Sequence, residues 1–305
     1  MHMSMAKEFY DDYGGVSLNE ELLPKELWEE FGILACYCGE DAKLRTSFLL
    51  RNNYGEKYIL KCRKISEPGG LEVEAEQMKR LHAHFPGKYA ISKYWTNDEY
   101  EYLLRHYQEG MNLEEYVERN PLRTEKEMLE ISIQILHAVG QIHKLCPPII
   151  HRDIKPKNLI LDSAGRIHLI DFETSRNYVS SKKKDTAFFG TEITAAPEQY
   201  GYAQTDERTD IYAVGKTMEF LLTGSYGEKY QGRDRRGRRL QKIIETACAF
   251  DPENRYKDTD SIEKQLNRLL GQESTGLRTA AFAGIGVAEL LIALLEILAG
   301  LHLIE

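Results

Sequence analysis

Cysteine is scarce in this sequence, and the few cysteines form no pattern that would hold a metal ion or a set of disulfides. The 305 residues contain five of them, at Cys36, Cys38, Cys62, Cys146 and Cys248. The count is odd and no secretory signal precedes them, so we expect free thiols in a reducing, cytoplasmic setting. A zinc site at the closely spaced first pair is not indicated, because no matching set of histidines and cysteines lies nearby.

Internal repeats, long low-complexity linkers and an excess of basic charge are also missing. Hydrophobic residues make up 42% of the chain and charged residues 29%, which is typical of globular proteins and disfavours disordered, collagen-like and polytopic membrane classes. The formal net charge of -8 argues against a dedicated nucleic-acid binder. The length suits one large domain or two lobes around a cleft.

Hydrophobic periodicity predicts a β-rich first third followed by a helical remainder. Five runs are typical of strands, and they cover residues 33–38, 44–51, 57–63, 90–95 and 100–107. A helical pattern lies between the third and fourth of these runs, over residues 71–83. Beyond Asn112, a candidate helix cap, the pattern stays helical, with a long amphipathic helix over residues 125–145. We therefore expect an α+β protein with two lobes that meet near Gly110.

The strongest chemical signal is the segment His151-Arg-Asp-Ile-Lys-Pro-Lys-Asn158, followed thirteen residues later by Asp171. Two short apolar runs between Asn158 and Asp171 predict a hairpin that brings these two residues to neighbouring strand ends. Their side-chain oxygens suit Mg²⁺, which also takes phosphate oxygens as ligands. Asp153 would then act as a base or orienting group for a hydroxyl nucleophile, and Lys155 would neutralise a transferring phosphoryl group.

This constellation resembles the catalytic core of eukaryotic-type (Hanks-type) Ser/Thr protein kinases, of the kind found in many bacteria. The resemblance runs from about residue 27 to residue 270 and implies a bilobal protein kinase-like fold. It identifies Asp153 as the catalytic aspartate and Lys61 as the lysine that contacts the nucleotide phosphates. It identifies Glu74 as the glutamate that pairs with this lysine, with Glu72 and Glu76 as nearby alternatives.

Further motifs extend the resemblance through the second half of the chain. Asn158 matches the second metal ligand and Asp171 the aspartate of the DFG motif, which implies ATP and Mg²⁺ as cofactors. The segment 190–198 matches the site that binds the substrate next to the acceptor hydroxyl, where Thr191 is typical of Ser/Thr kinases. An aspartate that braces the catalytic loop and a glutamate–arginine pair complete the match, at Asp210, Glu198 and Arg255.

The resemblance implies an ATP-dependent Ser/Thr protein kinase that transfers the γ-phosphate to a protein hydroxyl. The expected layout is an N-terminal segment (1–26), a kinase domain (27–270, with lobes 27–109 and 110–270) and an apolar C-terminal helix (271–305). A protein substrate is expected, no nucleic acid, and a cytoplasmic catalytic domain.

Three positions depart from the kinase pattern. Gly39 is the only glycine left where a glycine-rich loop should cover the nucleotide, and Glu173 replaces the glycine of the DFG motif. Arg105 occupies the gatekeeper position and is expected to turn toward Glu74 or Asp171, unless the alignment is shifted by one residue. These departures define the alternative function, a pseudokinase or nucleotide-binding scaffold.

If that alignment holds, the backbone groups of His106 and Gln108 contact the adenine. Arg152, next to the catalytic aspartate, is expected to dock a phosphate on the activation loop. Thr186 is the first candidate for autophosphorylation, followed by Ser180 and Ser181, against the alternative that these are ordinary loop hydroxyls.

Charge almost disappears at the end of the chain. Residues 280–304 are long enough to span a bilayer, but they contain two glutamates and a histidine, so the energy of insertion is close to balance. Three alternatives stay open for this stretch: a membrane anchor, a helix that packs on a partner or on a second copy as a homodimer, and a helix docked on its own kinase domain.

Overall fold

The computed structural model of the chain describes residues 24, 27, 29–38, 44–67, 70–89, 91–178, 193–201 and 204–271. Most of the expected N-terminal segment and the whole apolar stretch 280–304 lie outside these ranges. None of the helices in the described ranges is long and apolar enough to cross a membrane.

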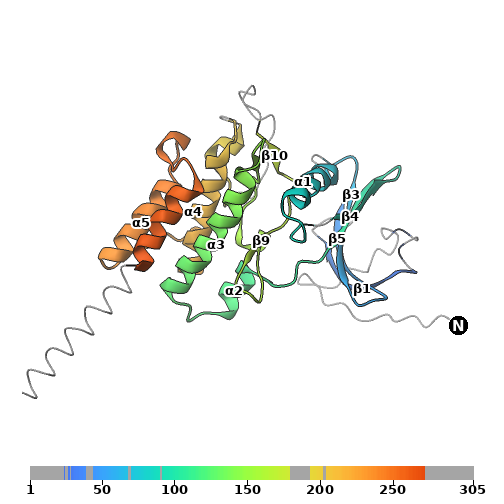
Figure 1. Cartoon of the computed structure of the whole chain (residues 1–305), viewed down its shortest axis with the longest axis horizontal. Coiled ribbons are helices and arrows are strands. Elements are labelled where there is room, and N and C mark those ends of the chain that lie inside the picture. Colours follow the sequence, from blue (N-terminus) through green and yellow to red (C-terminus); the bar gives the residue numbers. More distant parts are fainter. Residues whose placement is uncertain are drawn as a thin grey trace, which may run out of the picture.

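A five-stranded antiparallel sheet forms the N-terminal lobe, with strand order β1-β2-β3-β5-β4 (Figure 1). The strands are β1 (Phe31–Cys38), β2 (Arg45–Asn52), β3 (Lys57–Lys64), β4 (Ile91–Thr96) and β5 (Tyr100–His106). Buried side chains alternate with more exposed ones along β2, as expected for a strand with one face on a core. One core of this lobe contains Phe48, Leu50 and Leu60, and a second joins Leu103 to the one α-helix in the described part of the lobe.

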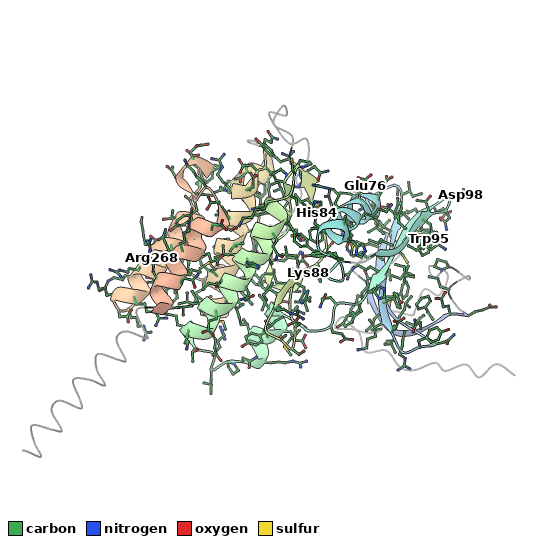
Figure 2. The ribbon with its side chains drawn as sticks, viewed as in Figure 1. Glu76, His84, Lys88, Trp95, Asp98 and Arg268 are labelled. Atoms are coloured by element: carbon green, nitrogen blue, oxygen red, sulfur yellow. The ribbon has the colours of Figure 1, made fainter. Side chains whose placement is uncertain are left out.

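That helix, α1 (Leu71–His84), packs against β4 and β5. Its buried face carries the apolar residues that the sequence predicts, together with Glu74, which is fully buried. The alternatives Glu72 and Glu76 are exposed, and Figure 2 shows Glu76 on the outer side of the helix. A carboxylate in a buried position requires a charged or hydrogen-bonding partner, so the burial of Glu74 already points to a cation beside it.

The C-terminal lobe is mainly helical (Figure 1). Its helices are α2 (Leu113–Arg119), α3 (Glu125–His143), α4 (Glu207–Thr223) and α5 (Arg235–Ala247), followed by a helical stretch over residues 259–271. Short strands are β6 (Met111–Asn112), β7 (Ile149–Ile150), β8 (Leu159–Leu161), β9 (Ile167–Leu169) and β10 (Arg176–Asn177). Helix α3 packs on α4, and α4 packs on α5, around a core that includes Ile135, Val214 and Leu240.

Side-chain caps fix where the helices of this lobe begin. Asn112 caps α2, as predicted, by accepting a hydrogen bond from the backbone N–H of Glu115 (2.9 Å). Thr124 caps α3 through a capping box with Glu127. Helix α4 begins at Glu207 behind its cap Asp206, so Asp210 lies inside the first turn rather than at the helix start.

The two lobes are joined by the chain between β5 and β6, which passes through Gly110. This glycine has a φ of 140°, and a Cβ atom there would lie 2.5 Å from the carbonyl oxygen of Leu161. Both the backbone conformation and the space therefore require glycine at this position. The predicted α+β fold, with a β-rich first lobe and a helical second lobe, is confirmed.

Candidate active site

Lys61, at the centre of β3, links the two lobes through two carboxylates. Its Nζ lies 2.5 Å from Oε2 of Glu74 on α1 and 2.8 Å from Oδ1 of Asp171 in the C-terminal lobe. The lysine side chain is 11% exposed, so both ion pairs are shielded from solvent. The pairing of Lys61 with Glu74 that the resemblance implies is present in the structure.

The charges of this triad shift the ionisation of its members. Burial alone would lower the pKa of Lys61, but the negative charges of Asp171 and Glu74 outweigh it and raise that pKa above its ordinary value. Burial would likewise raise the pKa of Asp171, but the charge and hydrogen bond of Lys61 hold it well below its usual range. Lys61 and Asp171 are therefore both charged at neutral pH.

Asp153 and Asn158 are held together by hydrogen bonds within the loop that follows β7. The side-chain amide of Asn158 donates to the backbone oxygen and to Oδ2 of Asp153, at 2.9 Å each. Nζ of Lys155 lies 2.9 Å from the same Oδ2. Because both amide hydrogens of Asn158 point to Asp153, its amide oxygen is the atom available to a cation.

Asp210 on α4 fixes the backbone of the loop that carries Asp153. Its fully buried carboxylate accepts hydrogen bonds from the backbone N–H groups of His151 and Arg152, at 2.8 Å each, and contacts Nε2 of His143 at 2.8 Å. Burial opposes ionisation of Asp210, but these partners lower its pKa below the ordinary value. Arg152 has a φ of 66°, a strained value for a residue with a side chain, and the bonds to Asp210 hold it there.

The predicted hairpin is formed by β8 and β9, and it brings Asp171 beside Asn158. The backbone N–H of Ile170 donates to the carbonyl oxygen of Asn158 at 3.1 Å. Asp171 is the second non-glycine residue in the described ranges with a positive φ, at 67°. The ring of Phe172 packs against the ring of His151, with centroids 4.8 Å apart, which ties the segment after β9 to the catalytic loop.

A cavity of about 950 Å³, the front cavity, collects these groups at the junction of the lobes. Its lining includes Lys61, Ile59, Ile160, Asn158 and Asp171. The volume lies within the range of small-molecule sites, and the lining combines three isoleucines with a larger number of charged and polar side chains. The amide oxygen of Asn158 and the carboxylate of Asp171 are hard oxygen donors, so this pair of residues fits Mg²⁺.

Arg105 lines both the front cavity and a smaller rear cavity of about 420 Å³. The rear cavity lies between α1, the end of β5 and the segment after β9. Nε of Arg105 is 3.8 Å from Oε1 of Glu74, so of the two carboxylates expected as its partner the ion pair forms with Glu74. Glu74 is therefore shared between two cations, Lys61 and Arg105.

Glu173, the residue in place of the DFG glycine, is buried and bound to two arginines. Its carboxylate pairs with the guanidinium groups of Arg63 on β3 and Arg45 on β2. Burial raises the pKa of Glu173 above its ordinary value despite the nearby positive charges of Lys61 and the two arginines. The sequence predictions missed both arginines. The spacing of the charges could have indicated the contact with Arg63. Lys61 and Arg63 are two residues apart on one strand, and their partners Asp171 and Glu173 are also two residues apart.

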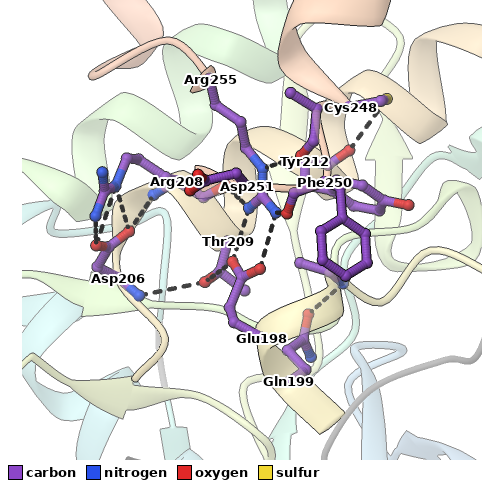
Figure 3. Close-up of polar contacts among 12 residues, drawn as sticks. Glu198, Gln199, Asp206, Arg208, Thr209, Tyr212, Cys248, Phe250, Asp251 and Arg255 are labelled. Carbon is purple, nitrogen blue, oxygen red and sulfur yellow. Dashed lines mark hydrogen bonds and ion pairs between the residues drawn. The ribbon is translucent and has the colours of Figure 1, made fainter. Parts of the chain in front are cut away.

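The expected pair of Glu198 and Arg255 is present and bidentate (Figure 3). The two guanidinium nitrogens lie 2.7 and 2.8 Å from the two carboxylate oxygens, and both residues are buried. The hydroxyl of Thr209 on α4 also donates to Glu198 at 2.8 Å, a contact that sequence reasoning missed. The pair ties the turn Pro197–Tyr200 to the loop before the last helical stretch.

The remaining predicted residues are placed only in part. His106, at the end of β5, packs on the ring of Tyr58 with centroids 4.6 Å apart and lines the rear cavity, whereas Gln108 lines both cavities. Arg152 donates from Nε to the carbonyl oxygen of Thr174 at 2.6 Å. Five predicted residues lie outside the described ranges: Gly39, Ser180, Ser181, Thr186 and Thr191.

Comparison of the sequence with known proteins identifies a family and several relatives. The family described as "Protein kinase domain" matches residues 49–275. The chain is similar to serine/threonine-protein kinase PrkC of Bacillus subtilis (strain 168), with 30% identity over 201 residues, 59% of this chain and 31% of that protein. It is similar to probable serine/threonine-protein kinase PknB of Lactococcus lactis, with 30% identity over 198 residues, 63% of this chain and 30% of that protein.

A third relative is serine/threonine-protein kinase F of Synechocystis sp., with 27% identity over 213 residues, 65% of this chain and 42% of that protein. The chain thus spans less than half the length of each of these relatives.

Proposed function

The chain belongs to the protein kinase domain family, and from this premise we propose that it is an ATP-dependent serine/threonine protein kinase. The proposed reaction transfers the γ-phosphate of ATP to a hydroxyl of a protein substrate. One observation carries the proposal: Lys61, Asn158 and Asp171, from three separate segments, converge on the front cavity next to Asp153. Neither the family match nor the relatives favour the alternative of a pseudokinase scaffold.

Asp153 would orient the acceptor hydroxyl and take its proton during transfer. Its carboxylate is fixed by Asn158 and Lys155, and its loop is fixed by Asp210, so it needs little rearrangement before reaction. Lys155, beside Asp153, would stabilise the negative charge of the transferring phosphoryl group.

Lys61 would bind the phosphates of the nucleotide, with Glu74 holding its ammonium group in place. Nζ of Lys61 lies 2.8 Å from Oδ1 of Asp171, so the ammonium group would sit directly beside the carboxylate proposed to bind the metal. A magnesium ion held by Asn158 and Asp171 would neutralise phosphate charge when bound. The adenine would occupy the apolar part of the front cavity, next to Gln108.

Turnover of ATP on a generic protein substrate tests the proposal, with the variant Asp153→Asn as the decisive comparison. We expect a loss of phosphoryl transfer of about 10²- to 10⁴-fold, because the variant lacks the proton acceptor. Asp98→Asn is the matched control, since Asp98 lies in an exposed turn at the outer end of the N-terminal lobe (Figure 2). A wild-type protein that binds nucleotide without turnover would instead support the scaffold alternative.

A further inference from the structure

The buried charge cluster around Glu173 has no counterpart in the catalytic roles assigned above. Three charged side chains lie side by side across the N-terminal sheet, because Arg45 on β2 is the cross-strand partner of Arg63 on β3, and Arg63 is the partner of Glu101 on β5. Nε of Arg63 is 3.9 Å from Oε1 of Glu101. Two arginines in direct cross-strand register repel each other unless a negative charge is placed between them.

Glu173 supplies that negative charge from the other lobe. One of its carboxylate oxygens pairs with Arg63 and the other with Arg45. The two arginines differ in environment: the side chain of Arg63 is 4% exposed, whereas that of Arg45 is 59% exposed. The Arg63–Glu173 pair is consequently the buried anchor of the cluster, and Arg45 is its solvent-facing member.

The spacing of these charges matches that of the catalytic pair. Lys61 and Arg63 are two residues apart on β3 and therefore point to the same face of the sheet. Asp171 and Glu173 are two residues apart in the segment after β9, and they meet Lys61 and Arg63 respectively. This segment is thus attached to one strand of the opposite lobe at two points, one on either side of Phe172.

We propose that Glu173 is a positioning residue: clamped by Arg63 and Arg45, its carboxylate fixes the Asp171 segment against the N-terminal sheet, in the orientation that presents the Asp171 carboxylate to a bound metal ion. The proposal rests on the proposed kinase function, since it assigns the metal to Asp171. It gives the glycine-to-glutamate departure a positive role. A glycine lets the backbone at this point change conformation, whereas the clamped glutamate holds it in one.

The test compares binding of ADP with and without Mg²⁺ in wild type and in Glu173→Gln. The glutamine keeps the shape of the side chain but removes the charge between the arginines. We expect the affinity for ADP with Mg²⁺ to fall by about tenfold or more, as for other residues that orient a metal ligand, while the metal-free affinity stays within about twofold. A purely structural role would lower both affinities together, and that result would overturn the proposal.

Two arginine variants provide a matched pair. Arg63→Met should reproduce the selective loss of the Mg²⁺-dependent affinity, because it removes the buried anchor. Arg45→Met should change that affinity by less than about threefold, because the Arg45 side chain is more than half exposed and solvent screens its charge. Equal effects of the two variants would contradict the proposed anchor. The double variant Glu173→Gln/Arg63→Met should be no worse than the poorer single variant, and additive effects would show that the two residues act separately.

The outcomes separate the two proposals. One outcome is a wild-type protein that shows no phosphoryl transfer but binds ADP in a Mg²⁺-dependent way, with that dependence lost in Glu173→Gln. This outcome would refute the kinase function and retain the positioning role. Active wild type with an unchanged Mg²⁺ dependence in Glu173→Gln would refute only the positioning role. Wild type without any Mg²⁺-dependent nucleotide binding would overturn both.

Discussion

At the scale of single residues, the site is organised by carboxylates that share cations. Glu74 is shared by Lys61 and Arg105, and Lys61 is shared by Glu74 and Asp171. Each buried charge therefore has at least one partner of opposite sign, which is the condition under which ionised groups persist away from water. Removal of any one member would leave a neighbour buried without its full set of partners.

The ionisation of Asp171 leads to a pH prediction. An unfolded chain takes up a proton at this carboxyl near pH 3.9, whereas in the folded protein Lys61 keeps it ionised to lower pH. The pair thus stabilises the fold fully above about pH 5 and progressively less as the pH falls below about 4. Urea unfolding of wild type and Asp171→Asn across this range should show the difference in free energy of unfolding shrinking toward acid. A difference that stayed constant down to pH 3 would be inconsistent with a depressed pKa.

At the scale of elements, the buried ion pair between Glu198 and Arg255 anchors the turn Pro197–Tyr200. Arg255→Met should reduce the free energy of unfolding by about 3 to 5 kcal/mol, because it leaves Glu198 charged and buried without its bidentate partner. Arg268→Met is the control, since Arg268 is exposed on the last helical stretch (Figure 2), and it should change stability by less than about 0.5 kcal/mol. Chemical denaturation of both variants measures the difference, and similar values for the two would contradict the assigned role.

The periodicity of hydrophobic residues was enough to predict most helices and strands. It works because β2 buries every second residue and α1 buries one face, so the pattern of burial is already present in the order of the residues. Asp210 was predictable from the resemblance, whereas the helix cap Asp206, four residues before it, was not singled out in the sequence. The Lys61–Glu74 pair was predictable from the resemblance alone. The clamp on Glu173 was not, because it depends on how β2 and β3 meet a segment more than a hundred residues away, which no local pattern encodes.

At the scale of the whole molecule, two lobes meet at the front cavity, and the core of the C-terminal lobe also takes in Leu81 of α1. A nucleotide bound there contacts both lobes, so it should stabilise the entire described part of the chain rather than one lobe.

Predictions that concern phosphorylation at Thr186, Ser180 or Ser181, and membrane or partner binding by residues 280–304, fall outside the described residues and stay predictions.

A thermal unfolding series tests this coupling between lobes. At about 100 times its dissociation constant, ATP with Mg²⁺ should add about 2.7 kcal/mol to the free energy of unfolding. That corresponds to a rise in Tm of about 4 to 5 °C for a protein of this size. Removal of the metal with EDTA should abolish most of the rise. A shift of the same size with and without Mg²⁺ would argue against metal binding by Asn158 and Asp171.

Arg105 has a consequence for inhibitor chemistry. The guanidinium group of Arg105, which is ion-paired with Glu74, lines both the front cavity and the rear cavity. A neutral aromatic compound that enters the rear cavity must displace or desolvate this cation, which is costly, whereas a compound with a carboxylate at that point would gain a charged hydrogen bond. Compounds that reach the rear cavity should therefore be sought among acids.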